Sequence, residues 1–166
     1  PLYPDRRVDT RETVCLPPQH ELTDLLYGDA SLQEIFNGMH DYRLEAPGDF
    51  PVEYREYKPN SANGVAMGWH RDLVMYEEPQ VEMVYTVFND DARTRFQWQD
   101  SNGVTQTVRP VANDMVFVKA NGPMHRVTGL GDKRRGIIKM IAHRASSPPI
   151  RSMHAQKEAC PLLTKK

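Results

Sequence analysis

The stretch VEMVYTVFND, residues 81–90, favours a β-protein, because it is rich in Val, Tyr and Phe and closes on polar turn residues. Downstream, FQWQDSNGVTQTV (96–108) predicts two strands joined by a hairpin turn at Asp100-Ser101-Asn102-Gly103. The short apolar runs MVFV (115–118) and GIIKMIA (136–142) predict two more strands.

Upstream of this block, VEYREY (52–57) alternates as a strand does, KPNSANG (58–64) is a strong loop signal, and residues 65–72 can carry another strand. Between residues 20 and 40 the apolar positions recur at helical spacing, with a break at residues 28–31 that indicates two short helices. Two helices followed by about seven short strands predict a mainly β-protein with N-terminal helices, of the jelly-roll or a related barrel type.

The length of 166 residues and the apolar content of 39% suit one domain with a well-filled core. We divide it into an irregular lead-in, a helical buttress, a β core and an extended tail, which are residues 1–19, 20–49, 50–144 and 145–166.

The formal net charge of −1 gives no general attraction to nucleic acid or to an acidic membrane, and no apolar run approaches the ~20 residues that span a bilayer. No secretory signal is apparent. Because the first residue is Pro1, the earlier removal of a leader peptide is an open alternative. Cys15 and Cys160 lie one near each end of the sequence, and a single end-to-end bridge between them is an open alternative. They are interpreted as free thiols, which favours a cytoplasmic or nuclear protein over a secreted one. The oligomeric state is not predicted.

Three residues have the types that bind a mononuclear Fe(II) ion. His70 and Asp72 are two positions apart and share one face of a strand, and His125 follows 55 residues later, which leaves room for strands that bring it back. Two imidazoles and one carboxylate on one face of the metal leave the other face open for a chelating oxo-acid and O2. Taken singly, the first pair also fits a surface ion pair, and His125 fits a turn residue.

A basic residue after the second histidine could hold the distal carboxylate of such an oxo-acid through paired, charge-assisted hydrogen bonds. Arg135 and Arg134 both qualify, because the strand alternation leaves plausibly apolar residues on both faces. Lys139 shares the face of Arg135, and a buried ammonium there needs a partner such as a carboxylate of cosubstrate or substrate.

The sequence from Tyr57 to about residue 143 resembles the catalytic core of Fe(II)/2-oxoglutarate dioxygenases, especially the prolyl-hydroxylase-like branch. The matching motifs, in collinear order, are EYKPN (56–60), WHRD (69–72), VYTVFN (84–89), TRF (94–96), PVANDMVF (110–117), HRV (125–127) and Arg135. This resemblance implies a double-stranded β-helix in which His70, Asp72 and His125 bind iron and Arg135 binds the C5 carboxylate of 2-oxoglutarate.

The same resemblance implies that Tyr57 and Thr94 line the cosubstrate site. Two departures concern backbone conformation. Ala92-Arg93 replaces the glycines that are usual before Thr94, and Asn113 replaces a common glycine, a mild change because Asn tolerates left-handed backbone.

The predicted activity is therefore an O2-dependent dioxygenase that uses Fe(II) and 2-oxoglutarate, hydroxylates a C–H bond of its substrate and releases succinate and CO2. A protein prolyl residue is the substrate that the resemblance favours, within the wider class of peptides and small molecules. Two alternatives stay open: nucleic-acid demethylation by the same chemistry, for which no basic groove with interleaved aromatic residues is evident, and a non-catalytic β-barrel binding module.

Overall fold

The structure is a computed structural model that describes residues 11–17, 19–38, 52–57, 65–129, 133–144 and 146–150. The predicted loop at 58–64 lies outside these ranges. The elements, in chain order, are β1 (Arg11–Leu16), α1 (Glu21–Tyr27), α2 (Ala30–Asn37), β2 (Val52–Tyr57), β3 (Val65–His70), β4 (Val81–Asn89), β5 (Arg95–Gln99), β6 (Thr105–Val108), β7 (Met115–Lys119), β8 (His125–Thr128) and β9 (Arg135–Ala142).

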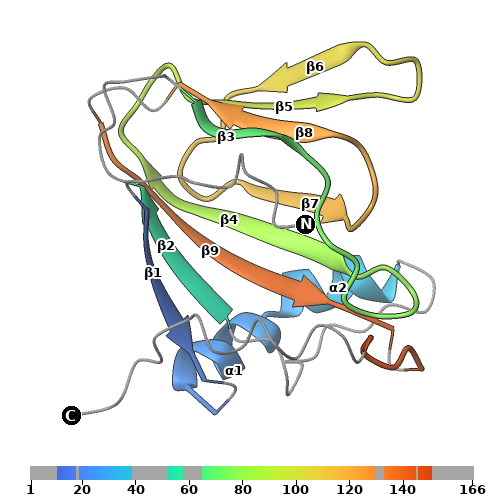
Figure 1. The fold of residues 1–166 in the computed structure, drawn as a ribbon. Helices are drawn as coiled ribbons and strands as arrows, with labels where there is room; N and C mark the ends of the chain where they lie inside the picture. Colours follow the sequence, from blue (N-terminus) through green and yellow to red (C-terminus); the bar gives the residue numbers. More distant parts are fainter. Residues whose placement is uncertain are drawn as a thin grey trace.

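These strands form two antiparallel sheets, ordered β1-β2-β9-β4-β7 and β3-β8-β5-β6. Figure 1 shows the two sheets facing each other, with α1 and α2 against the outer side of the larger sheet. The prediction of a mainly β-protein with N-terminal helices is confirmed.

The chain folds as a long hairpin that is wound onto itself. At its tip β5 pairs with β6, and moving away from the tip β4 pairs with β7, β3 with β8 and β2 with β9. The strands before the hairpin therefore meet those after it in reverse order. This pairing brings β3 and β8, which carry the histidines of the predicted site, side by side.

The two helices bury the outer face of the larger sheet. Gly28 ends α1 and Asp29 begins α2 by accepting a hydrogen bond from the amide of Leu32 (3.0 Å), which explains the predicted break. The hydroxyl of Tyr27 donates to the carbonyl of Ile141 (2.8 Å) and ties α1 to β9. The apolar core on this side consists of Leu16, Tyr27, Phe36, Val52, Val81, Met83, Met140 and Ala142. No helix in the described ranges is long and apolar enough to cross a membrane.

Two interpretations of the N-terminal region are wrong. Residues 11–16, assigned to an irregular lead-in, form β1 along β2, because the edge of β2 offers unpaired backbone groups to a neighbouring strand. Cys15 is disulfide-bonded, not a free thiol. Because disulfides persist in oxidising compartments, Cys15 no longer supports a cytoplasmic or nuclear location. Cys160 lies outside the described residues.

Residues 146–150, which we assigned to the extended tail, contact the loop before β4. Pro149 forms an isolated bridge with Tyr76, and the amide of Ile150 donates to the carbonyl of Met75 (2.8 Å). The rest of the predicted tail, residues 151–166, lies outside the described ranges.

Gly129 follows β8 at a position where a side chain has no room. Its φ is +87°, and a Cβ there would lie 2.2 Å from the carbonyl oxygen of Arg93. We expect Gly129→Ala to lower the free energy of unfolding by about 2–4 kcal/mol, because left-handed strain adds to a backbone clash beside Thr94. Gly103→Ala is the matched control: φ is +76°, but nothing lies within 4 Å, so a loss of about 1 kcal/mol is expected in urea unfolding. Equal losses for the two variants would contradict the clash.

Candidate metal centre

His70, Asp72 and His125 converge at one end of the smaller sheet. His70 is the last residue of β3 and His125 the first of β8, and the two are direct partners in the ladder. The candidate ligand atoms of the three residues all lie within 4.8 Å of one another. Nε2 of His125 is 3.2 Å from one carboxylate oxygen of Asp72, and Nε2 of His70 is 3.9 Å from the other. One cation can therefore contact all three.

Each imidazole is oriented by the backbone two residues before it. Nδ1 of His70 lies 2.8 Å from the carbonyl oxygen of Gly68, and Nδ1 of His125 lies 3.1 Å from that of Pro123. A carbonyl only accepts, so Nδ1 carries the proton and donates, and Nε2 faces the carboxylate of Asp72. This is the arrangement that fixes the ring of a metal-binding histidine.

The Asp72 carboxylate is held in its ionised form. Burial raises its pKa, but the hydrogen bond from His125, the charge of Lys139 and the nearby His70 outweigh burial and bring the pKa below the usual range. For His125, burial lowers the pKa and the hydrogen bond to Asp72 raises it, with a net upward direction. A carboxylate ionised across the neutral pH range is what a divalent cation needs as a ligand.

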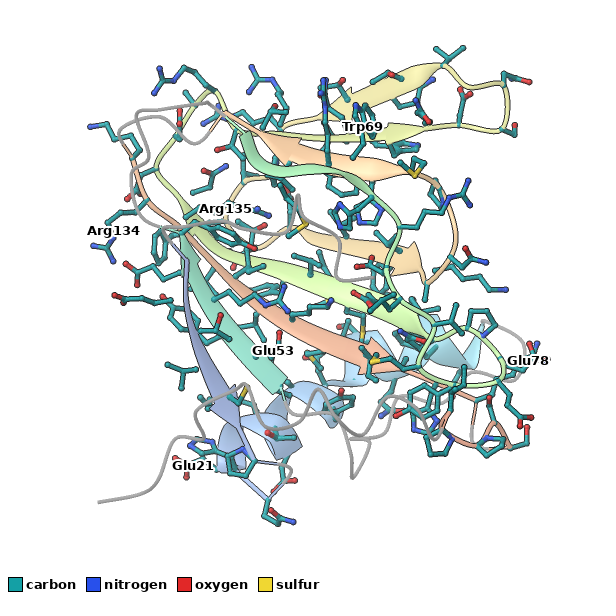
Figure 2. The ribbon with its side chains drawn as sticks, in the orientation of Figure 1. Glu21, Glu53, Trp69, Glu78, Arg134 and Arg135 are labelled. Atoms are coloured by element: carbon teal, nitrogen blue, oxygen red, sulfur yellow. The ribbon has the colours of Figure 1, made fainter. Side chains whose placement is uncertain are left out.

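The sequence left open which of two arginines faces the interior. Figure 2 shows Arg135 directed between the sheets and Arg134 directed away from them. Arg134 is 55% exposed and pairs with Glu56 (2.8 Å), whereas Arg135 is only 4% exposed. Arg135 lies opposite Tyr57 in the ladder, with its guanidinium carbon 5.8 Å from the centre of the Tyr57 ring.

Arg135 is a buried cation without a carboxylate partner in the described part of the chain. Its Nε atom has no hydrogen-bond acceptor among these described residues, and burial lowers the pKa of the guanidinium. A buried charge without a partner is costly, and a bound carboxylate would remove that cost. This residue therefore fits the distal carboxylate of a 2-oxo-dicarboxylic acid.

Within the described ranges, the buried hydroxyls Thr94 Oγ1 and Thr86 Oγ1 also lack hydrogen-bond partners. Thr94 follows a turn in which the side chain of Asp91 accepts from the amide of Arg93 (2.8 Å), so an Asp-capped turn replaces the expected glycines. Thr86 on β4 is opposite Ile137, two residues from Arg135 along β9, so both lie on the inward face of the larger sheet. Unsatisfied hydroxyls of this kind suit a polar ligand.

Lys139 faces the interior, and its ammonium is paired within the protein. It contacts one carboxylate oxygen of Glu82 and lies 3.8 Å from Asp72. Neither Glu82 nor Thr86 was identified from the sequence. The alternation of β4, in which residues 82, 84 and 86 share a face, was the available signal.

The chain matches no protein-family model and no curated protein by sequence. It is similar in structure to a 2OG-Fe(II) oxygenase family protein from Burkholderia pseudomallei, with a TM-score of 0.56 and 14% identity over 74% of this chain and 55% of that one. A Pseudomonas putida prolyl-4-hydroxylase has a TM-score of 0.58 and 19% identity over 82% of this chain and 72% of that one.

The chain has the fold of the 2OG-Fe(II) oxygenases. The same fold is found in a prolyl hydroxylase from Trichoplax adhaerens, solved with a peptide fragment of the hypoxia inducible factor oxygen degradation domain. For that protein the TM-score is 0.58 and the identity is 9%, over 84% of this chain and 65% of that one. The chain spans about half the length of the Burkholderia protein.

Proposed function

We propose that the protein is an Fe(II)- and 2-oxoglutarate-dependent dioxygenase. The observation that carries the proposal is the pairing of His70 with His125 across β3 and β8, with Asp72 between their Nε2 atoms. Arg135, on the larger sheet, is buried and has no carboxylate partner among the residues that the structure describes, which adds the second requirement, a site for the cosubstrate's distal carboxylate. The winding of the paired strands and the fold likeness support the double-stranded β-helix that we expected.

In this proposal His70, Asp72 and His125 hold Fe(II), and Arg135 holds 2-oxoglutarate, with Tyr57 and Thr94 beside it. Bound together with O2, Fe(II) and 2-oxoglutarate would supply the oxidation that hydroxylates a substrate C–H bond, with release of succinate and CO2. The chain's residues do the positioning. The carbonyls of Gly68 and Pro123 keep the histidine Nε2 atoms directed at the metal, and the buried guanidinium sets the orientation of the cosubstrate.

For the substrate we propose a peptide or small molecule, with a protein prolyl residue as the first candidate. The support is the likeness to two prolyl hydroxylases, one of them solved with a peptide. The net charge of −1 makes a nucleic-acid substrate the weaker candidate, since nucleic-acid binding depends largely on basic surfaces. Succinate release measured with proline-rich peptides and with methylated oligonucleotides separates the two; faster turnover of the oligonucleotides would overturn the assignment.

Metal loading should stabilise the fold. A ligand at about 100 times its Kd adds about 2.7 kcal/mol, which in a chain of this size raises Tm by about 5–10 °C. We expect this shift with Mn(II), a redox-inert substitute for Fe(II), and a further rise when 2-oxoglutarate is added. Differential scanning calorimetry measures both. A protein that shows neither shift would be a non-catalytic β-barrel binding module.

A further inference from the structure

The carboxylate of Asp72 lies beside a row of buried and partly buried polar side chains, Lys139, Glu82 and Gln80. Lys139 lies 3.8 Å from Asp72 Oδ1 and is in direct contact with Glu82. The side-chain amide of Gln80 in turn donates to the carboxylate of Glu82 (3.4 Å). Gln80 is fully buried and Glu82 is 4% exposed, so this row belongs to the interior and not to the surface.

The strand register explains how these residues meet. Lys139 on β9 is opposite Val84 on β4, and Ile141 is opposite Glu82. Residues two apart on a strand share a face, so Lys139 and Glu82 are diagonal neighbours on the inward face, within reach of each other. Asp72 comes shortly after β3 of the opposite sheet. Lys139 therefore contacts Glu82 on its own sheet and lies close to Asp72 at the end of a strand of the other sheet.

Gln80 also fixes the loop that follows Asp72. Its side-chain amide donates to the carbonyl of Leu73 (2.8 Å), and its side-chain oxygen accepts from the amide of Met75 (3.1 Å). The backbone of Asp72 is held from the other side, where its carbonyl accepts from the amide of Asn121 (3.1 Å). Both the backbone and the carboxylate of Asp72 are therefore restrained.

We propose that Lys139, Glu82 and Gln80 are positioning residues that hold one oxygen of Asp72 so that the carboxylate offers the metal its other oxygen alone. This inference rests on the proposed function, because it assumes a divalent cation between His70, Asp72 and His125. A carboxylate that bound through both oxygens would occupy one of the coordination positions that a chelating cosubstrate and O2 need.

The placement of charge supports this role. A buried ion pair is seldom more stable than apolar residues of similar volume, so the Lys139–Glu82 pair contributes little as a packing element. The ammonium of Lys139 is placed where it attracts an oxygen of Asp72. Glu82 compensates this positive charge, which would otherwise repel the metal cation. Outer partners of metal ligands of this kind typically change metal affinity by about 10–100-fold.

The test uses Lys139→Met, which keeps the length of the side chain and removes its charge. We expect the affinity for Co(II), measured by chelator competition, to fall about 10–100-fold, and the visible absorption of the bound Co(II) to change with its coordination number. Lys119→Met is the matched control, because Lys119 is exposed at the end of β7 and should leave affinity and spectrum unchanged.

Lys139→Met leaves Glu82 buried without its cationic partner, which lowers the stability of the fold for a reason unrelated to the metal. The double variant Lys139→Met/Glu82→Leu removes both charges. We expect it to regain the parental Tm without metal while keeping the loss of Co(II) affinity and the altered spectrum. If the double variant regains the parental Co(II) affinity and spectrum together with its stability, the positioning role is wrong. It is also wrong if Lys139→Met binds Co(II) with the affinity and the spectrum of the parent. If the parent itself binds no Co(II), the proposed function fails instead.

Discussion

His125→Ala is expected to abolish metal binding at neutral pH. The substitution removes one of three ligands, and the loss of a ligand should exceed the 10–100-fold effect of residues that act on ligands from outside. The affinity for Mn(II) or Co(II) should therefore fall by more than about 100-fold. Isothermal titration calorimetry measures it, with circular dichroism to establish that the fold is retained.

The matched control is His143→Phe. His143 is stacked on Tyr76 with the ring centroids 4.6 Å apart, and it is not part of the candidate metal-binding group found in the described residues. A phenyl ring preserves this packing. This variant should bind metal as the parent does. An unchanged metal affinity in His125→Ala would disprove the ligand assignment and with it the proposed function.

Arg135→Ala is expected to leave metal binding intact and to raise the 2-oxoglutarate requirement steeply. A guanidinium makes two charge-assisted hydrogen bonds to a carboxylate, each contributing about 1.5–3 kcal/mol. Their loss corresponds to at least a 100-fold rise in the concentration that half-saturates the enzyme, at about 1.4 kcal/mol per tenfold change. The thermal shift produced by 2-oxoglutarate on the Mn(II)-loaded protein gives the same quantity without turnover.

Arg134→Ala serves as its control. This neighbouring arginine has the same charge but points outward to Glu56, so its removal should change the 2-oxoglutarate requirement by less than threefold, as expected for an exposed ion pair. A larger effect in Arg134→Ala than in Arg135→Ala would mean that the outward arginine serves the cosubstrate, contrary to the burial of the two side chains.

Much of the fold could be predicted because its signals are local. The hairpin at Asp100–Gly103 and the left-handed Asn113, with φ of 71°, follow from turn chemistry at single positions. Strand β1 could not be predicted in this way. Residues 11–16 become a strand only because β2 offers them an edge, and no short-range pattern records that partner.

For the candidate site as well, one part was predictable from local sequence signals and the other part depended on tertiary contacts. The sequence by itself determined the types and order of the candidate metal ligands, because two imidazoles and a carboxylate are a chemical requirement visible in His70, Asp72 and His125. The tertiary structure decided the rest. Both faces of β9 are apolar enough to pack, so only the two packed sheets select Arg135 over Arg134, and only the register between β4 and β9 gives Lys139 its partner Glu82. Strand alternation gives two faces, and burial against other strands selects the inner one.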